Sequence, residues 1–329
     1  MDPSSIADYI RTAALLSGFS RVRFLSPYKP EHIFGSLAEQ DNHWVGSPSL
    51  LVTALPYGNR GISGPLGQPE AIAPFARRNY YAEAVGRLKD LAKDFRGRFG
   101  GLRSDYRILC NSPVPEKPLA LLCGLGWLGK NSLIITPEAG SLVIIAAMTL
   151  PVVLPPDPPL PGVFPDTSGA ASDGPLPLDL RTIAFPACRI CGDSPACMEA
   201  CPTKALSGDG TVQIHRCIQW YASGNGGTVP DFVAAVWGKR LYGCTNCQDA
   251  CPYNKKVIGG TETKRGILPE YVSAEWIVNA FDEEIISTVK GSALGMQWLG
   301  PASLRRNARL ALRRAEPYTP ARQDLRKGS

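Results

Sequence analysis

Eight cysteines in the second half of the chain stand at spacings that bind iron–sulfur clusters. Two runs each end in a Cys-Pro pair, at Cys201-Pro202 and at Cys251-Pro252. In ferredoxin-type motifs the closely spaced thiolates hold one cubane, while the cysteine before the proline ligates the neighbouring one. The spacing therefore predicts two [4Fe-4S] clusters in a redox protein that moves single electrons. Cluster 1 is predicted to take Cys188, Cys191, Cys197 and Cys251, and cluster 2 to take Cys201, Cys217, Cys244 and Cys247.

The first run departs from the standard spacing. Five residues, Gly192 to Ala196, separate Cys191 from Cys197, where the standard run has two. The three additional residues include a glycine and a proline, and we expect them to bulge outward. Structural zinc is the alternative for paired C-x-x-C motifs, but zinc sites do not require the paired Cys-Pro endings.

The composition is that of a globular protein in a reducing compartment. The chain has 329 residues, of which 44% are hydrophobic and 19% are charged, and a net charge of +6. Ten cysteines in a reducing cytosol favour metal binding over disulfides. The first residues lack the order of a signal peptide, and the longest apolar run, Leu142 to Leu154, contains Pro151. We therefore expect a cytoplasmic protein that makes no membrane contact.

The elements that must position these cysteines fall into three predicted regions of an α+β protein. Residues 1–184 alternate helix and strand signals, and a proline-rich arm over 151–186 holds ten of the thirty prolines. Residues 185–260 carry the cluster cysteines, and residues 261–329 form a basic helical region. Helices are predicted over 6–18 (with Ser4 or Ser5 as N-cap), 74–95, 271–281 and 302–315; strands over 21–26 and 49–55; and a hairpin over 132–148. The helix over 74–95 is expected to pack on the sheet through apolar residues at helical spacing, namely Tyr81, Val85, Leu88, Ala92 and Phe95.

Two segments of the chain resemble the signature of the epoxyqueuosine reductases. One is Pro118-Leu119-Ala120 followed by Gly124-Leu125-Gly126-Trp127-Leu128-Gly129-Lys130-Asn131-Ser132-Leu133. The other runs from Gly238-Lys239-Arg240-Leu241-Tyr242-Gly243-Cys244-Thr245-Asn246-Cys247-Gln248 to Cys251-Pro252-Tyr253-Asn254. Arg216-Cys217-Ile218 and the stretch from Val52 to Tyr57 also fit, so the resemblance covers roughly residues 49 to 315.

The resemblance implies a cobalamin-binding, nitroreductase-like α/β domain, then a ferredoxin-like two-cluster domain and C-terminal helices. It implies that the clusters feed electrons to cobalt, which reduces epoxyqueuosine to queuosine in tRNA at the end of queuosine biosynthesis. The implied partners are tRNA and an external electron donor such as a flavodoxin or a ferredoxin. Candidate cobalamin contacts are Lys130, Asn131 and Ser132, with Gln219, Thr245 and Asn246 from the cluster domain.

The glycines of the first segment also match a dinucleotide-binding pattern in form. Gly124, Gly126 and Gly129 stand as G-x-G-x-x-G, but no apolar parallel strand leads into them and no acidic residue follows at the expected distance. We interpret them as a glycine-lined wall that lets a flat macrocycle approach the backbone.

One departure from the family concerns the proton donor. An ungapped match puts Cys110, with Asn111 beside it, where the family has an aspartate thought to donate a proton. The reference pKa values of a thiol and an aspartic acid differ by more than about four units. Either Cys110 is the catalytic donor, or proton delivery has moved. This keeps open a related reductase of a small molecule, or a non-catalytic electron-transfer protein, as alternatives. Cys123 is interpreted as a small buried hydrophobe.

The C-terminal tail carries the basic excess. Residues 301–329 hold eight Arg and Lys against Glu316 and Asp324, and Arg305, Arg309 and Arg313 are predicted to line one helix face. Such a face suits the phosphates of a nucleic acid. The alternative is a solvated helix face.

Overall fold

A four-stranded antiparallel sheet forms the centre of the first region. The structure, a computed structural model, describes residues 2–26, 47–57, 71–163, 189–224, 227–257, 267–268 and 271–313. The sheet has the order β1-β2-β7-β4, and every neighbouring pair is antiparallel. Its strands are β1 (Arg21–Leu25), β2 (Ser49–Pro56), β4 (Ile108–Leu109) and β7 (Val143–Leu150).

The central strand β2 supplies side chains to both faces of the sheet. Leu50, Val52 and Ala54 join one buried cluster, while Leu51 and Leu55 join another. This alternation follows from the two-residue period of a strand. The continuous apolar stretch of β2 therefore belongs to a strand that is covered on both sides.

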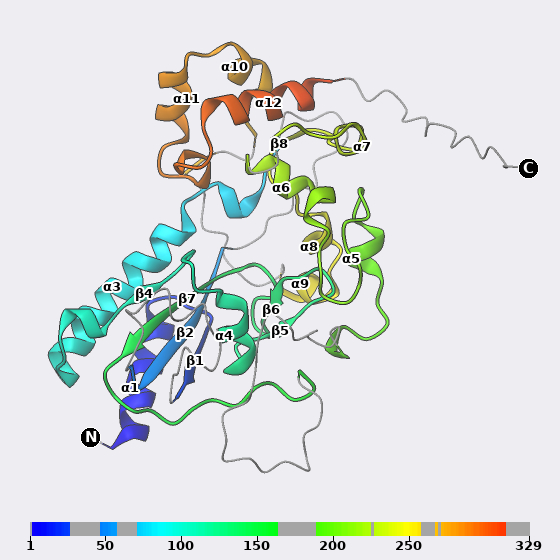
Figure 1. Ribbon diagram of the computed structural model, residues 1–329. Coiled ribbons are helices and arrows are strands. Elements are labelled where there is room, and N and C mark those ends of the chain that lie inside the picture. Colours follow the sequence, from blue (N-terminus) through cyan, green and yellow to red (C-terminus); the bar gives the residue numbers. More distant parts are fainter. Residues whose placement is uncertain are drawn as a thin grey trace, which may run out of the picture.

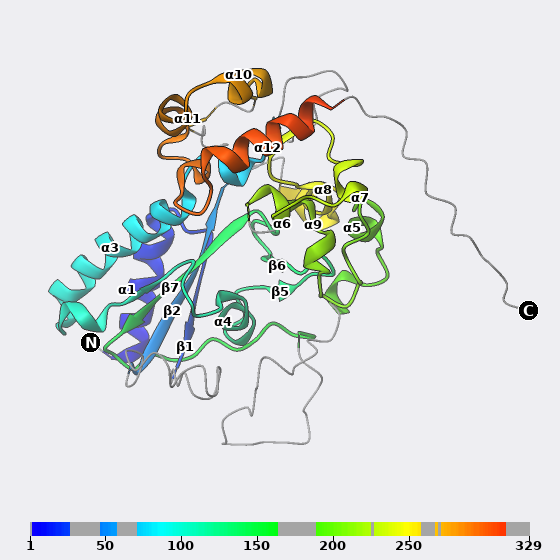
Figure 2. The same cartoon turned by 45° about the horizontal axis from the view of Figure 1, so that its top comes forward.

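Helices α1 (Pro3–Leu16) and α3 (Tyr80–Phe99) cover one face, and α4 (Glu116–Leu122) covers the other (Figures 1 and 2). The predicted N-cap of α1 is wrong. The Asp2 carboxylate, one residue before Pro3, accepts from Ser4 N at 3.0 Å and Ser5 N at 3.1 Å. Proline at the first helical position fixes the start of the helix, which leaves the capping position to Asp2.

Helix α3 confirms a long helix in this part of the chain, but it begins at Tyr80 rather than at residue 74, ends at Phe99 and buries a rotated face. Leu88 and Phe95 are buried as the pattern predicts. Its other buried residues are Tyr80, Ala84 and Leu91, whereas the predicted positions Tyr81, Val85 and Ala92 are half-buried. Their side chains instead face the cavities described below.

The predicted hairpin over 132–148 is wrong in its pairing. A bridge between Thr136 and Gly140 does close a turn, but the strand before it, β6 (Ile134–Ile135), pairs with β5 (Trp127–Leu128). The strand after it, β7, pairs with β2 and β4. The turn thus joins two sheets rather than two strands of one sheet.

The cluster region is built of short helices that pack beside the sheet (Figure 1). They are α5 (Ala196–Glu199), α6 (Ile218–Ala222), α7 (Asp231–Ala234), α8 (Asn246–Asp249) and α9 (Pro252–Val257). The strand β8 (Arg240–Tyr242) pairs in parallel with β3 (Ala71–Ile72), which comes from the first region.

The C-terminal helices complete the core of the cluster region. They are α10 (Ala274–Asn279), α11 (Asp282–Val289) and α12 (Pro301–Leu312). Trp237, Leu241, Ile277 and Leu304 share one buried cluster with Ile72 of β3. Helix α11 was missed by the sequence analysis.

The start of the predicted proline-rich arm is fixed to the first region. Asp157 accepts from Phe24 N at 2.8 Å and pairs with Arg11 at 3.2 Å and Arg23 at 3.0 Å. Residues 164–186 of the arm lie outside the described residues. In the part of the chain that the structure describes, no helix is long and apolar enough to cross a membrane.

Candidate functional site

Two short helices repeat one local geometry around the cysteines. Helix α5 begins one residue before Cys197, and α8 begins one residue before Cys247. After each helix the next motif cysteine closes a turn, with Cys201 N donating to Met198 O at 3.3 Å and Cys251 N donating to Gln248 O at 3.1 Å. The two helices contact each other. The two Cys-Pro motifs therefore share the same local structure, a short helix followed by a turn.

The cysteine thiols fall into two neighbouring groups. Burial, and then the proximity of Cys191 and Cys251, raise the pKa of Cys197. Burial is also the main cause that raises the pKa of Cys217, with Cys244 and Cys201 among its neighbours. Each group of three has the membership predicted for one cluster. Cys188, the fourth ligand predicted for cluster 1, lies outside the described residues.

Cys247 lies between the two groups. Its pKa is raised mainly by burial, then by Cys244 and Cys217, and further by Cys197 and Cys201. Among the described residues no three Cys, His, Asp or Glu side chains converge as ligands of a single metal ion. Thiolates around a four-iron cubane stand farther apart than those around one ion.

Two polar groups lie against the thiol of Cys201 in the second group. Ala205 N donates to Cys201 Sγ at 3.2 Å, and the hydroxyl of Thr203 lies 3.6 Å from the same sulfur. Hydrogen bonds to cluster sulfurs are one of the factors that set a cluster's reduction potential.

A buried polar network ties the cluster helices to the sheet. Gln248 Nε2 donates to Tyr57 Oη at 2.8 Å and to Ser141 O at 2.9 Å. Asn254 Oδ1 accepts from Ser141 N at 2.7 Å, and its Nδ2 donates to Gln248 O at 2.8 Å. Gln248 stands between Cys247 and Cys251 in sequence, so this network fixes the segment that carries one predicted ligand for each cluster.

Gly140 lets the network close. Its φ is +57°, and a Cβ added there would collide with Asn254 Oδ1. A left-handed backbone conformation and a close approach both favour glycine, so the tight turn before β7 is matched to the buried amide of Asn254.

A cavity of about 420 Å³ opens between the first region, the cluster region and the C-terminal helices. We call it the interdomain cavity. Gln219, two residues after Cys217, reaches its wall with a buried Oε1 that has no hydrogen-bond partner among the described residues. Its lining residues are Phe75, Tyr81, Asn111, Ile144, Gln219, Ser223, Tyr242, Ala293 and Trp298.

Gln219 is the one predicted cobalamin contact among the residues that line this cavity. Lys130 Nζ donates to Ser194 O at 3.3 Å. Asn131 is buried, and its Nδ2 has no partner within the described chain. Ser132 has a φ of +63°, and its carbonyl accepts from Lys117 Nζ at 2.7 Å.

The two remaining predicted contacts are held by residues of the neighbouring elements, α8 and β8. Thr245 Oγ1 donates to Asp249 at 2.7 Å, and Asn246 Oδ1 accepts from Arg240 Nη2 at 2.6 Å. These bonds order the loop between Cys244 and Cys247.

The glycine-rich segment does not have the setting of a dinucleotide loop. Gly124 and Gly126 follow helix α4 and precede β5, rather than leading from a strand into a helix. Gly124 has a φ of +66° and packs against the backbone of Pro158, and Gly126 packs against the backbone of Ile135.

Cys110 lies among weakly acidic groups. Burial, and then the nearby Glu116, raise its thiol pKa to about 12, and Sγ lies 3.8 Å from Ile145 O. Burial also raises the pKa of Glu116, whose Oε1 accepts from Asn111 N at 2.6 Å. The thiol therefore holds its proton at neutral pH.

Tyr81 links this group to the interdomain cavity. Its pKa is raised to about 12, mainly by burial, with Cys110, Glu116 and Tyr242 as smaller causes. The sequence analysis assigned Tyr81 to the helix core and did not single out Glu116. The helical period alone had no signal that distinguishes a ring lining a cavity from one in the core.

Comparisons with known proteins agree with this arrangement. A family model described as "4Fe-4S double cluster binding domain" matches residues 187–254. The epoxyqueuosine reductase of Vibrio cholerae is 30% identical over 246 residues, which is 74% of this chain and 58% of that protein. That of Salmonella typhimurium is 34% identical over 179 residues, which is 54% of this chain and 39% of that protein. The chain thus spans about half the length of the curated relatives it matches.

Solved structures share the fold. The epoxyqueuosine reductase from Streptococcus thermophilus has a TM-score of 0.70 at 22% identity, covering 94% of this chain and 81% of that one. The enzyme from Bacillus subtilis gives 0.71 at 23% identity with the same coverage. An epoxyqueuosine reductase solved with an epoxyqueuosine-modified tRNA-Tyr stem loop gives 0.71 at 22% identity.

Proposed function

Since this chain is a relative of the epoxyqueuosine reductases, we propose that it reduces epoxyqueuosine to queuosine in tRNA, with iron–sulfur clusters and cobalamin. The observation that carries the proposal is the match to an epoxyqueuosine reductase over 74% of the chain. The mixed helix and sheet fold and the double-cluster domain support it. Removal of the epoxide oxygen as water consumes two electrons and two protons.

The electrons would be supplied through two clusters that the eight cysteines hold. Cluster 1 takes Cys188, Cys191, Cys197 and Cys251, and cluster 2 takes Cys201, Cys217, Cys244 and Cys247. The two groups of neighbouring thiols support this partition. An external donor such as a flavodoxin or ferredoxin reduces the clusters in the cytoplasm. The finer architecture is a nitroreductase-like domain joined to a ferredoxin-like one.

The interdomain cavity is the proposed cobalamin and substrate site. Gln219 lines this cavity, and its buried Oε1 has no partner in the described chain, as expected of a residue that contacts a polar ligand. Gln219 would hold the cofactor from the cluster side. The further candidate contacts Lys130, Asn131 and Ser132 are not among the residues that line this cavity. Bound cobalamin supplies reduction at cobalt, and the protein's own groups supply protons.

Cys110 is the candidate proton donor. It occupies the position of the family's aspartate and stays protonated at neutral pH. Tyr81 and Glu116 lie close to Cys110, and burial raises the pKa of all three groups. They stand beside Asn111, whose backbone N donates to Glu116 and which lines the cavity together with Tyr81.

Conversion of epoxyqueuosine-tRNA to queuosine-tRNA tests the proposal. The anaerobically purified chain, reconstituted with iron, sulfide and cobalamin, should form queuosine in the presence of a strong reductant, as measured by nucleoside mass spectrometry. Clusters and cobalamin bound without any turnover of this tRNA would contradict it.

A related reductase of a small molecule is the second candidate. The replacement of the family's aspartate by Cys110 favours it, because a thiol is a much weaker acid than a carboxylic acid. Cobalamin binding without tRNA turnover would support this candidate. Clusters without cobalamin would instead favour an electron-transfer protein.

A further inference from the structure

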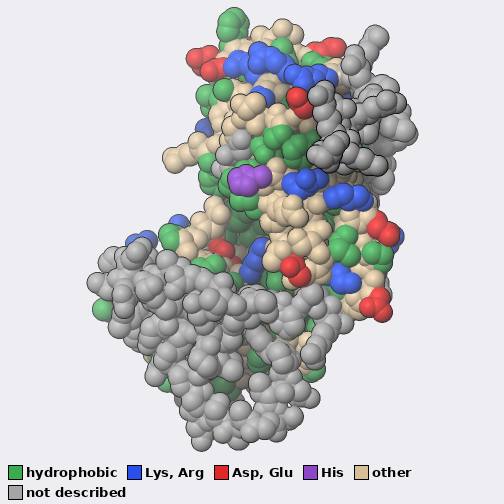
Figure 3. All heavy atoms as spheres, turned by 45° about the vertical axis from the view of Figure 1, so that its right-hand side comes forward, with side chains coloured by type: hydrophobic (Ala, Val, Ile, Leu, Met, Phe, Trp, Pro, Cys, Tyr) green, Lys and Arg blue, Asp and Glu red, His purple; other side chains and the backbone are tan. Residues whose placement is uncertain are grey.

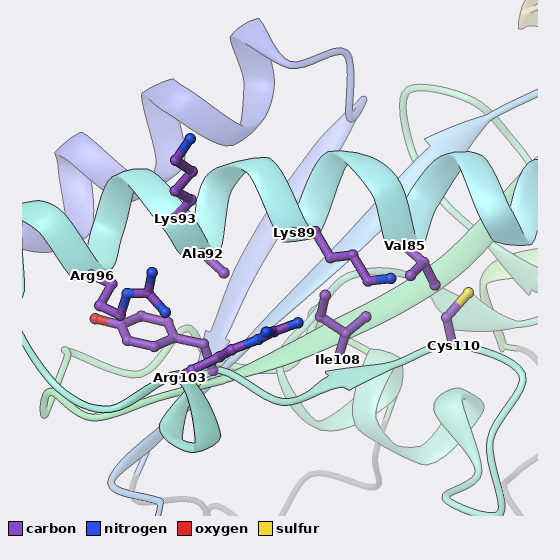
Figure 4. Close-up of a pocket in the computed structure, with 9 residues that line it drawn as sticks. Val85, Lys89, Ala92, Lys93, Arg96, Arg103, Ile108 and Cys110 are labelled. Atoms are coloured by element: carbon purple, nitrogen blue, oxygen red, sulfur yellow. The ribbon is translucent and has the colours of Figure 1, made fainter.

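A second cavity, of about 570 Å³, runs along α3 and carries only positive charge among its described lining residues. We call it the α3 groove. Lys89, Lys93 and Arg96 come from α3, and Arg103 comes from the turn before β4. Figure 4 shows Lys89 and Arg96 on the helix side, Arg103 on the opposite side, and Cys110 at one end. Val85, Ala92, Tyr106 and Ile108 supply its apolar and aromatic lining.

The four cations of the α3 groove are available to a ligand. All four are exposed, and within the described chain none of them has an ion-pair partner. Asp90, on α3 between Lys89 and Lys93, is exposed and does not line the groove. Two other nearby carboxylates are engaged elsewhere. Asp94 accepts from Tyr9 Oη at 2.6 Å and from Arg98 at 3.2 Å, and Asp105 accepts from Leu102 N at 2.7 Å.

The C-terminal helix uses its arginines differently. Arg305 pairs with Asp282 and donates to Ala280 O at 2.6 Å. Arg306 donates to Gly227 O at 2.6 Å and to Tyr221 O. Figure 3 shows Lys and Arg mixed with Asp and Glu at the end of the molecule formed by these helices. Of the predicted phosphate-binding face, Arg309 and Arg313 remain exposed.

The α3 groove and the interdomain cavity meet at one peptide. Cys110 lines the groove, and its neighbour Asn111 lines the interdomain cavity. Asn111 has a φ of +51°, a left-handed conformation that is uncommon outside glycine. On its side of this peptide the interdomain cavity is lined by the aromatic rings of Phe75, Tyr81, Tyr242 and Trp298.

We propose that the α3 groove binds the sugar–phosphate backbone of the substrate RNA while the target nucleoside enters the interdomain cavity beside Asn111. Lysine and arginine neutralise phosphates without reading sequence. Splayed bases of single-stranded loops stack on aromatic side chains. The positive charges along the groove thus suit the phosphate of a nucleotide, and the aromatic rings beyond it suit the base. This inference rests on the proposed function.

The test compares two triple variants that each remove three positive charges from the full-length chain with its clusters reconstituted. The groove variant is Lys89→Gln/Lys93→Gln/Arg96→Gln. The matched control is Lys204→Gln/Lys255→Gln/Lys290→Gln, which removes three exposed cations that lie outside the groove and outside the predicted face of the C-terminal helix. Binding of a fluorescent anticodon stem-loop RNA is followed by anisotropy over a series of salt concentrations.

The groove variant should bind the RNA at least roughly tenfold more weakly. Its slope of log K against log salt should shrink by about 2, because each contact to a single strand contributes about 0.7. The control should stay within about twofold of the wild type. A Lys89→Arg/Lys93→Arg variant, which keeps the charge, should bind as the wild type does, and iron content checks that all variants are folded.

The outcomes separate this inference from the proposed function. If the wild type binds and reduces the tRNA but only the control variant loses affinity, the inference fails and the function stands. If the groove variant binds RNA normally and loses its electron donor instead, the groove docks an acidic protein and the inference fails. If the wild type neither binds RNA nor reduces epoxyqueuosine, the proposed function and the inference both fail.

Discussion

Cys110 is the residue at which we expect the most consequential difference between this chain and the epoxyqueuosine reductases. A general acid works best when its pKa lies near the operating pH, and the pKa of Cys110 is about 12. The wild-type thiol stays protonated across the neutral range but releases its proton reluctantly.

A Cys110→Asp variant should therefore turn over epoxyqueuosine faster, by roughly tenfold or more at neutral pH. An acid must be protonated to donate, and the carboxyl loses its proton at lower pH than the thiol. The variant's rate should then fall at a lower pH than the wild type's, as measured in pH profiles of kcat. A Cys123→Asp change is no control, since Cys123 is fully buried; Cys110→Ser tests the loss of the thiol at similar size. Equal rates in the wild type, Cys110→Asp and Cys110→Ser would mean that another group donates the proton.

At the scale of elements, the link between α8 and the sheet depends on one amide. Gln248 donates to both Tyr57 and Ser141 from a buried position. An unsatisfied buried polar group costs about 1–3 kcal/mol.

A Gln248→Leu variant should accordingly lose about 2–3 kcal/mol of unfolding free energy and shift the reduction potentials of the clusters. Potentials followed by electron paramagnetic resonance are the informative readout, because a purely structural loss would leave them in place. The control is Gln213→Leu at an exposed position of the same region. If the reduction potentials of the Gln248→Leu variant are unchanged, Gln248 contributes only to the stability of the fold.

The long elements were predictable and the short ones were not. Helices α1 and α3 and strands β1 and β2 carry enough apolar residues to show their period. Strands β3 and β8 have two and three residues, and they exist because they pair with each other across the chain. The prediction of the α1 N-cap was wrong because Pro3 fixes the start of the helix. The prediction of the hairpin was wrong because β6 pairs with β5 instead of with β7.

At the scale of the whole molecule, we expect the cluster region to depend on its clusters for order. Helices α5 and α8 have four residues each, far fewer than a helix needs to be stable alone. Metal binding to a site absent from the unfolded chain adds directly to folding free energy.

Removal of iron under anaerobic conditions should therefore release residues 189–257 while leaving the sheet intact. Hydrogen exchange followed by mass spectrometry should report faster exchange at α5 and α8, with β2 and β7 still protected. Reconstitution should restore protection together with about eight irons per chain, four for each cluster. Zinc found in place of iron, or protection independent of iron, would contradict the cluster assignment.

The sequence predicts those parts of the candidate site whose residues all lie in one short segment of the chain. The cysteine partition could be proposed from spacing because the ligands of a cubane recur at short intervals. Contacts between segments that are distant in sequence create the roles of Tyr57, Ser141, Tyr81 and the α3 groove. Sequence periodicity indicates only that such residues are apolar or exposed.

The pairing of β3 with β8 has a consequence for biosynthesis. Ile72 and Ala76 are made early, yet they complete a core whose other members reach as far as Ala311. On a ribosome this segment has no β8 partner until residues 240–242 have emerged, and its core is complete only after α12 has followed. A fragment that begins at residue 185 would therefore lack part of its own interior. Expression of the cluster region alone should require residues 71–76 to be supplied with it.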